Sequence, residues 1–178
     1  MALTPGLTTI PLTINFRNSK AIAKVVSILG RNDTEPWDAC PEDFEPITAK
    51  CRNPQRDRRA ISELVEKLLK REGIVEDQIV VLTPHRKKSS CLKGCEELGG
   101  ARLSEDPIDR DKCVLHATLG GFKGLESDVV ILADIDLADE RASRRARYVA
   151  SSRARHLLYV WSNGDWQDPD ADSVLSER

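Results

Sequence analysis

Residues 120–132 place two adjacent glycines, a lysine and a third glycine directly before an apolar stretch, in the sequence GGFKGLESDVVIL. Glycines beside a lysine are typical of loops that bind phosphate through backbone amides and an ammonium group. A Walker A loop, however, has the order G-x-x-x-x-G-K-[ST] and leads from a strand into a helix. Here Lys123 precedes the last glycine, no Ser or Thr directly follows it, and a strand comes next. The segment is therefore not a Walker A loop.

No other segment supplies the missing parts of a triphosphate site. The sequence G-K-[ST] occurs nowhere in the 178 residues. The apolar segment 129–136, VVILADID, comes nearest to a magnesium-binding strand, but its acids alternate instead of forming the usual adjacent Asp-Glu pair. By itself, the chain is not expected to bind a nucleoside triphosphate in the P-loop manner.

Cysteine and histidine spacing does not predict a metal site. The five cysteines include no C-x-x-C pair, and a zinc site built on the closest two would have poor spacing and no second pair. We expect reduced, structural thiols, as in cytosolic proteins. The histidines have no acidic partner that the sequence identifies and are also expected to be structural. The cysteines are Cys40, Cys51, Cys91, Cys95 and Cys113, and the histidines are His85, His116 and His156.

Composition indicates a soluble globular protein with no overall preference for polyanions. Of the 178 residues, 40% are hydrophobic and 31% charged, and the formal net charge is −2. Any contact with DNA or RNA therefore has to be local. No apolar run approaches the roughly 20 residues of a membrane span, and the N-terminus lacks the charged start of a signal peptide. We expect a cytoplasmic protein with no membrane partner.

Strand-like and helix-like segments alternate along the chain, which predicts an α/β fold with a mostly parallel sheet and helices on both faces. An irregular, proline-containing excursion is expected over about residues 31–56, with one short strand at 47–51. Strands are predicted at 8–17, 78–84, 112–119, 127–135 and 156–162. Helices are predicted from Ser19 to Gly30, from Asp57 to about Gly73, over 89–100 and over 140–155. The acidic residues 163–178 are expected to be a loose tail.

In parallel α/β sheets, ligands bind at the carboxyl ends of the strands. Residues able to do chemistry follow three of the predicted strands, at 15–17, 84–86 and 118–126. We therefore expect these three segments to meet at one edge of the sheet and to form the binding site there.

Three segments in order resemble the later motifs of superfamily 1 helicases of the UvrD/Rep type. LTINFRNSKAIA at 12–23 resembles the N-[YF]-R motif, TLGGFKGLESDVVIL at 118–132 resembles motif V, and RYVASSRARHLLYVW at 147–161 resembles motif VI. DQIVVLTPHRK at 77–87 also resembles the family's I-x-[VI]-L-[TS]-P-x-R strand. The resemblance covers about residues 12–162 and implies the second RecA-like domain of such an enzyme, the domain that lacks the P-loop itself.

The resemblance implies a role for particular residues at an ATP site shared with a first domain. Arg17 and Arg153 stand at the two positions whose arginines reach the γ-phosphate, and a planar, permanently charged guanidinium suits that role. Lys123, Gly124 and Glu126 are implied to lie near the nucleotide. ATP and magnesium would be bound mainly by the first domain, which this chain does not contain.

The resemblance also implies a nucleic-acid path made of Thr118, Pro84, Arg86 and Gly120, with hydroxyls, backbone amides and cations contacting phosphates. Here the sequence departs from the family, because Gly120 stands where a histidine is expected and Gly121 where a bulkier residue is frequent. One nucleic-acid-contacting side chain is therefore missing. The short spacing between Pro84 and the next strand also leaves no room for the subdomain that many members insert there.

We expect residues 1–162 to be the C-terminal domain of an ATP-dependent superfamily 1 DNA helicase or translocase, inactive as an ATP hydrolase without its first domain. Its partners would be that N-terminal RecA-like domain and single-stranded or partly duplex DNA, with RNA still open. The alternative is a non-catalytic module that keeps the fold and binds nucleic acid or a protein. A Walker A sequence upstream in the gene would distinguish the two.

Overall fold

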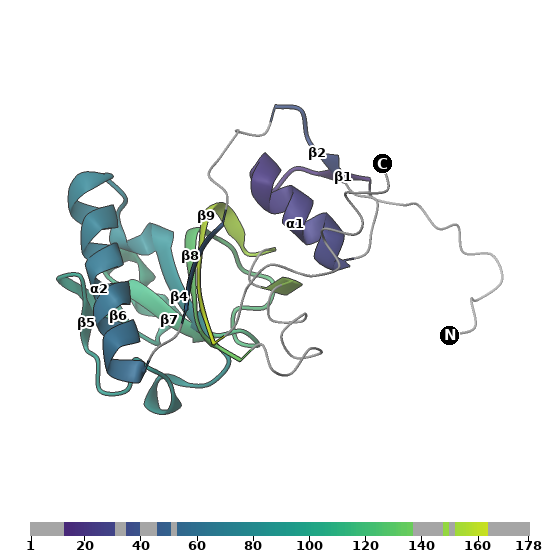
Figure 1. Cartoon of the computed structure of the whole chain (residues 1–178). Coiled ribbons are helices and arrows are strands. Elements are labelled where there is room, and N and C mark those ends of the chain that lie inside the picture. Colours follow the sequence, from purple (N-terminus) through teal and green to yellow (C-terminus); the bar gives the residue numbers. More distant parts are fainter. Residues whose placement is uncertain are drawn as a thin grey trace.

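The computed structural model describes residues 13–30, 35–39, 46–50, 53–136, 148–149 and 152–163. Its centre is a seven-stranded sheet with the spatial order β3-β9-β8-β4-β7-β6-β5 (Figure 1). Every neighbouring pair is parallel except β5 and β6. The predicted mostly parallel α/β sheet is confirmed. The strands are β3 (Ile47–Lys50), β4 (Ile79–Thr83), β5 (Glu97–Leu98), β6 (Ala101–Ser104), β7 (Val114–Thr118), β8 (Ser127–Ile135) and β9 (Ala154–Ser162).

Both faces of the sheet are apolar, and a helix covers each of them. Successive residues of a strand point to opposite faces, so Val81 packs with α2 (Pro54–Arg71) in one cluster and Val80 with α1 (Lys20–Gly30) in another. Figure 1 shows the two helices on opposite sides of the central strands. This two-sided burial explains why the central strands are continuous apolar runs without a polar alternation.

The start of α2 is well specified by its sequence. Asn53 precedes it in extended conformation, its side-chain oxygen accepts a hydrogen bond from the Arg56 amide at 2.9 Å, and Pro54 occupies the first turn. The helix therefore begins three residues before the predicted Asp57. For α1 the predicted limits are confirmed, but the buried Ser19 hydroxyl has no hydrogen-bond partner among the described residues.

The predicted excursion contains more order than its composition suggests. Its short strand is present as β3, which forms one edge of the main sheet beside β9, with Ile47 opposite Tyr159. A separate two-stranded parallel pair joins β1 (Ile14–Asn15) to β2 (Glu35–Pro36). Residues 31–34, 40–45 and 51–52 of the excursion lie outside the described part of the chain.

The predicted helix over 89–100 is wrong. The segment begins with a short 3-10 turn, η2 (Lys87–Ser89), continues through turns and ends in β5. Its apolar residues Cys91, Leu92, Cys95 and Leu98 are buried, and their spacing imitates one face of a helix. The following β6 was not predicted. Two further 3-10 turns, η1 (Glu76–Gln78) and η3 (Pro107–Lys112), precede β4 and β7.

The predicted helix over 140–155 falls mostly outside the described residues. Tyr148 and Val149 are helical, whereas Ala154 and Arg155 already belong to β9, which begins two residues before the predicted position. Residues 164–178 also lie outside the described part. None of the described helices is long and apolar enough to span a membrane.

The hairpin between β5 and β6 generates a stability prediction. A methyl group on Gly99 would lie 2.3 Å from the Glu66 backbone nitrogen in α2, and Gly99 has φ +60°. Gly99→Ala should therefore lower the free energy of unfolding by about 2–5 kcal/mol, combining overpacking with left-handed strain. Gly100→Ala, with φ +87° and open space around the methyl group, is the control and should lose only about 1–2 kcal/mol. Urea unfolding measures both, and equal losses would contradict the steric explanation.

Candidate functional site

The first residues of β8 and β9 lie side by side. Ser127 pairs with Ala154, and the Ser127 amide donates to the Arg153 carbonyl at 3.0 Å. The two strands are parallel, so their amino ends meet at the same edge of the sheet. Glu126 and Arg153, each one residue before its strand, are therefore neighbours at what we call the amino edge.

A turn after β1 brings Arg17 to the same place. The Asn15 side-chain oxygen accepts hydrogen bonds from the amides of Arg17 and Asn18, at 3.0 and 3.2 Å. The Asn18 side chain in turn donates to the Ala154 carbonyl, at the start of β9. Held this way, Arg17 places its Nε 2.8 Å from Glu126 Oε2. The sequence-predicted residues Arg17, Glu126 and Arg153 are thus brought together.

The predicted position of Arg17 and Glu126 beside 84–86, at the carboxyl ends of the strands, is wrong. Residues 119–126 leave the carboxyl end of β7 and cross the sheet to the amino end of β8, because consecutive parallel strands require such a crossover. Phe122, in the middle of the crossing, is fully buried in the α1-side cluster. Gly124 and Glu126 therefore lie past the crossing, toward the amino edge, while Thr118 remains at the carboxyl edge.

Charges of opposite sign alternate at the amino edge. Glu126 lies between Arg17 and Arg155, whose Nε is 3.9 Å away, and Arg155 also approaches Asp128 at 3.3 Å. Asp128 accepts a further hydrogen bond from Gln78 at 2.8 Å. Sequence reasoning missed Asp128 and Arg155. The sequence did contain a signal for them, because residues two apart in a strand share a face. Asp128 lies two residues after Glu126, and Arg155 lies two residues after Arg153.

Arg153 has unused hydrogen-bonding capacity. Its Nη1 is 3.4 Å from the Leu125 carbonyl oxygen, and its buried Nε has no hydrogen-bond partner within the described structure. A guanidinium group has five N–H donors, so most remain available for a ligand. Arg17 and Arg153 contact the adjacent residues Glu126 and Leu125. This donor set fits an anionic oxygen-rich group such as a triphosphate.

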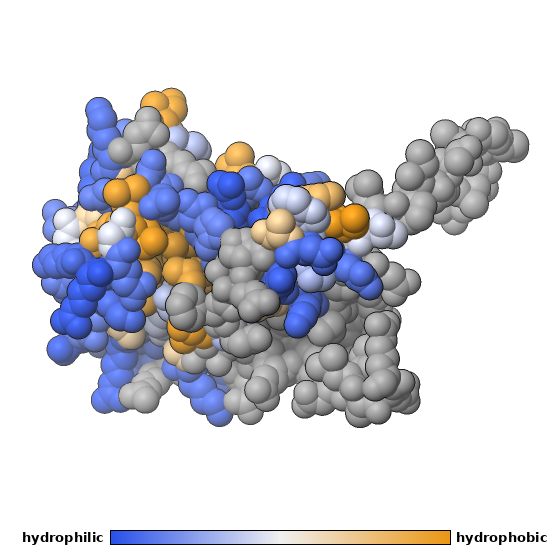
Figure 2. All heavy atoms as spheres, turned by 90° about the horizontal axis from the view of Figure 1, so that it is seen from above, coloured by the Kyte–Doolittle hydropathy of each residue, from blue (hydrophilic) through white to orange (hydrophobic). Residues whose placement is uncertain are grey.

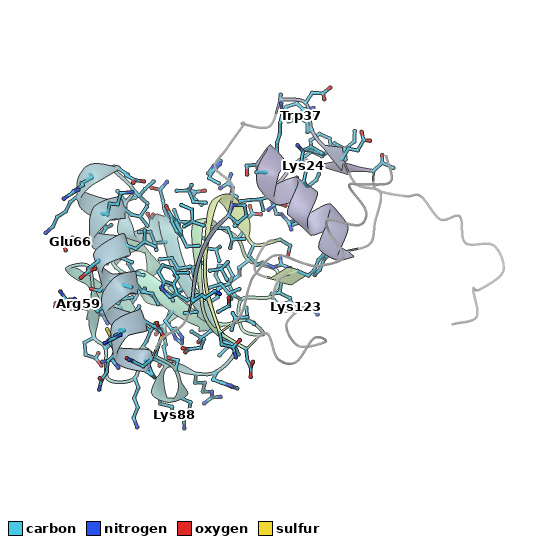
Figure 3. All side chains as sticks on the ribbon, in the orientation of Figure 1. Lys24, Trp37, Arg59, Glu66, Lys88 and Lys123 are labelled. Carbon is cyan, nitrogen blue, oxygen red and sulfur yellow. The ribbon has the colours of Figure 1, made fainter. Side chains whose placement is uncertain are left out.

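The loop between Phe122 and Glu126 depends on a glycine. Gly124 has φ +85°, a left-handed conformation that other residues rarely adopt. The Leu125 amide then donates to the Phe122 carbonyl at 3.2 Å, which closes the turn. Lys123 is exposed on this loop, where Figure 3 shows it below α1. The ion pairs described for Glu126 are with arginines.

The predicted nucleic-acid residues gather at the opposite, carboxyl edge. Thr118 is opposite Thr83 in the β4–β7 pairing, and the Leu119 amide donates to the Thr83 carbonyl at 3.0 Å. Pro84 and Arg86 follow Thr83 directly. The Thr118 hydroxyl accepts a hydrogen bond from the Gly121 amide at 3.0 Å and keeps its own proton for an acceptor. The predicted residues Thr118, Gly120, Pro84 and Arg86 therefore all lie on connections that leave this edge of the sheet.

The two unusual glycines of this surface differ in the space around them. A methyl group on Gly120 would meet nothing within 4 Å, whereas a methyl group on Gly121 would lie 3.0 Å from the Thr118 hydroxyl oxygen. Gly120 can accept a side chain without moving its neighbours. Gly121 cannot do so unless Thr118 shifts.

A buried histidine supports the same edge. His116 is 1% exposed, and its Nε2 lies 2.8 Å from the Thr83 hydroxyl, which donates to the His85 carbonyl at 2.6 Å. Because the hydroxyl has one proton, Nε2 must be the donor to Thr83. Nδ1 lies 3.4 Å from Glu105, and His156 lies 3.8 Å from Asp128, so both histidines do have nearby carboxylates. Burial lowers the pKa of His116, although Glu105 opposes that effect.

Metal ligation finds no support within the described residues, where no group of three or more His, Cys, Asp or Glu side chains could hold an ion. Cys91, Cys95 and Cys113 are buried free thiols. Cys40 and Cys51 lie outside the described part.

Comparison with known proteins supports the predicted resemblance. Residues 117–161 match a family model. The model is that of the UvrD-like helicase C-terminal domain. The matched stretch runs from the end of β7 through β9 and contains Thr118, Gly120, Glu126 and Arg153, but neither Arg17 nor Pro84. No curated protein matches the chain.

One solved structure shows the same fold. The C-terminal domain of a possible DNA helicase from Lactobacillus plantarum WCFS1 is similar with a TM-score of 0.57 and 16% identity, covering 84% of this chain and 88% of that one. A structure of the PRRSV helicase has a TM-score of 0.43 and 16% identity over 85% of this chain, which spans only 23% of that protein. The first similarity confirms the predicted RecA-like α/β fold.

His116 generates a prediction about pH. Its pKa is lowered in the folded protein, so below about pH 6.5 the unfolded chain takes up a proton that the folded chain does not. Stability should therefore be full above about pH 6.5 and decline as the pH falls below it. His116→Gln keeps a donor for Thr83 and should flatten this decline in urea unfolding at a series of pH values. The exposed His85→Gln is the control, and an unchanged slope for His116→Gln would refute the assignment.

Proposed function

We propose that this chain is the C-terminal RecA-like domain of an ATP-dependent superfamily 1 helicase or translocase. The observation that carries the proposal is the convergence of Arg17 and Arg153 on Leu125 and Glu126 at the amino edge. The two arginines come from opposite ends of the chain, and two tertiary hydrogen bonds, from Asn18 to Ala154 and from Ser127 to Arg153, bring them together.

The two arginines would act on the phosphates of a nucleotide held against this edge by a first domain. ATP with magnesium would supply the transferable phosphoryl group and the metal charge. Arg17 and Arg153 would neutralise the charge that spreads over the phosphoryl oxygens in the transition state. Glu126 holds Arg17 in place beforehand, so that fewer side-chain rotamers have to be lost when an anion binds.

The side chains around the arginines suit a face that packs against another domain. Phe16 is 65% exposed, Leu125 44% and Tyr148 38%, and all three belong to the segments that carry or contact the two arginines. Large apolar side chains gathered among charged ones mark interaction surfaces. Figure 2, seen from above the orientation of Figure 1, shows apolar patches between hydrophilic side chains.

The separation of the two edges gives the proposed enzyme a simple layout. Nucleotide phosphates would bind at the amino edge, and the nucleic acid would bind at the carboxyl edge, over Thr118, Gly120, Pro84 and Arg86. Residues 118–126 contribute to both surfaces and cross the sheet on the buried Phe122. A movement of residues 118–126 would therefore change the geometry of both edges.

The decisive test uses the chain together with its Walker A-bearing first domain. Arg153→Ala should lower kcat of DNA-stimulated ATP hydrolysis by about 10³–10⁵, as for arginine fingers in comparable enzymes. Arg102→Ala, which removes an exposed arginine paired with Asp109, is the control and should leave the rate unchanged. Normal hydrolysis by Arg153→Ala would refute the proposed role. Absence of a Walker A sequence from the gene and its neighbours would favour a non-catalytic binding module instead.

Gly120 provides a gain-of-function test of the nucleic-acid edge. Since a Cβ atom at Gly120 meets no neighbour within 4 Å, Gly120→His should restore a hydrogen-bonding side chain to the carboxyl edge and tighten binding of single-stranded DNA several-fold. Gly121→His is the matched control and should weaken or leave unchanged the affinity, because its side chain collides with Thr118. Fluorescence anisotropy with a labelled oligonucleotide measures both. Equal effects of the two changes would argue against the assigned path.

A further inference from the structure

A basic segment follows β4 at the carboxyl edge. Residues 84–93, which we call the basic loop, contain Arg86, Lys87, Lys88 and Lys93 and no acidic residue, whereas the whole chain has a net charge of −2. Positive charge is thus concentrated on the connection between β4 and β5, at the same edge of the sheet as Thr118. Figure 3 shows Lys88 at this end of the molecule.

The first turn of α2 adds to the basic loop. Arg58 Nε donates to the Cys91 carbonyl at 2.8 Å, which ties the start of the helix to the loop. Arg56, two residues earlier in the same turn, is exposed. The free amides at a helix N-terminus carry partial positive charge and favour anions nearby. The helix therefore strengthens the positive potential that the loop already has.

Four of these cations are available to a ligand. Arg56, Arg86, Lys88 and Lys93 are exposed and make no ion pair with any other described residue. Acids on the neighbouring segments contact other groups: Glu63 pairs with Arg59, and Glu96 pairs with Lys87 of the basic loop. Glu105 and Asp134 accept hydrogen bonds from the backbone amides of Lys87 and Cys91 in the loop. Lys24, Arg71, Lys112 and Lys123 are also exposed without an ion pair to a described residue, but they are scattered along the chain, whereas Arg86, Lys88 and Lys93 lie on one loop.

The basic loop is held in one conformation. The Thr83 hydroxyl donates to the His85 carbonyl, the Ser90 hydroxyl donates to the Lys87 carbonyl at 2.9 Å, and the Leu92 amide donates to Ser90 at 3.1 Å. Cys91 and Leu92 are buried in the α2-side core. A loop anchored in this way loses little conformational entropy when a ligand binds.

We propose that the basic loop, together with Arg56, binds the phosphate backbone of a single nucleic-acid strand and extends the path from Thr118 along the carboxyl edge to α2. The Leu119–Thr83 hydrogen bond makes the two parts of the path contiguous. The loop has no Phe, Tyr or Trp on which bases could stack. The contacts are therefore with phosphates and independent of base sequence. This inference rests on the proposed helicase function and assigns residues that the family resemblance does not.

The test compares two triple variants of the 178-residue chain in binding to a labelled single-stranded oligothymidylate, without ATP. The first variant is Arg56→Gln, Lys88→Gln and Lys93→Gln. The control, Lys24→Gln, Arg71→Gln and Lys112→Gln, removes the same charge from exposed, unpaired cations elsewhere on the described surface. The first variant should bind the oligonucleotide at least about tenfold more weakly than the parent chain. The plot of log affinity against log salt concentration should also become less steep by about 2, since each of the three lost phosphate contacts contributes about 0.7 to the slope. The control should bind like the parent chain.

Each other outcome overturns the inference. Equal losses in both triples would show a general effect of net charge. If the first triple variant binds the oligonucleotide like the parent chain while Thr118→Val binds it more weakly, the path at Thr118 stands and its extension over the basic loop is refuted. Weaker association with the first domain but unchanged oligonucleotide binding would show a protein-docking surface instead. Absence of any binding by the parent chain would remove the nucleic-acid surface, while the ATPase test of Arg153 would still decide the nucleotide site separately.

Discussion

The parallel pairing of β4, β8 and β9 is the constraint on which the rest of the molecule depends. Parallel strands cannot be joined by tight hairpins, so each connection has to carry the chain from the carboxyl edge back to the amino edge. In this protein, residues 119–126 make that crossing in eight residues without a helix, with Phe122 buried on the way. Burial of a phenylalanine side chain contributes about 1.5–3 kcal/mol, which holds the crossing against the sheet.

The crossing divides one motif between two surfaces. Thr118 remains beside Thr83 at the carboxyl edge, whereas Glu126 reaches Arg17 at the amino edge. Residues that are close together in the sequence therefore serve different ligands in the proposed function. Residues far apart in the sequence, such as Arg17 and Arg153, serve the same ligand. The turn at Gly124 directs Glu126, at the end of the crossing, toward Arg17 and Arg155.

The two edges also differ electrostatically. At the amino edge the arginines are balanced by Glu126 and Asp128, which suits a site that has to hold its cations in place until a neighbouring domain brings an anion. At the carboxyl edge Arg86, Lys88 and Lys93 have no such balance. A surface of unpaired cations on a rigid loop suits a long polyanion that binds and slides without recognition of its bases.

The sequence by itself determined the fold class, the order of the central strands along the chain, the limits of α1 and the family resemblance, because these depend on local periodicity and on motifs contiguous in the chain. Tertiary structure alone decided where the motif residues meet. The general rule placed Arg17 and Glu126 at the carboxyl ends, but the crossing of residues 119–126 and the pairing of Ser127 with Ala154 place them, together with Arg153, at the amino ends of β8 and β9. The missed β6 and the false helix over 89–100 have a related cause. Four buried side chains in that segment have helical spacing, and only their contacts with the sheet and α2 show that the backbone turns instead.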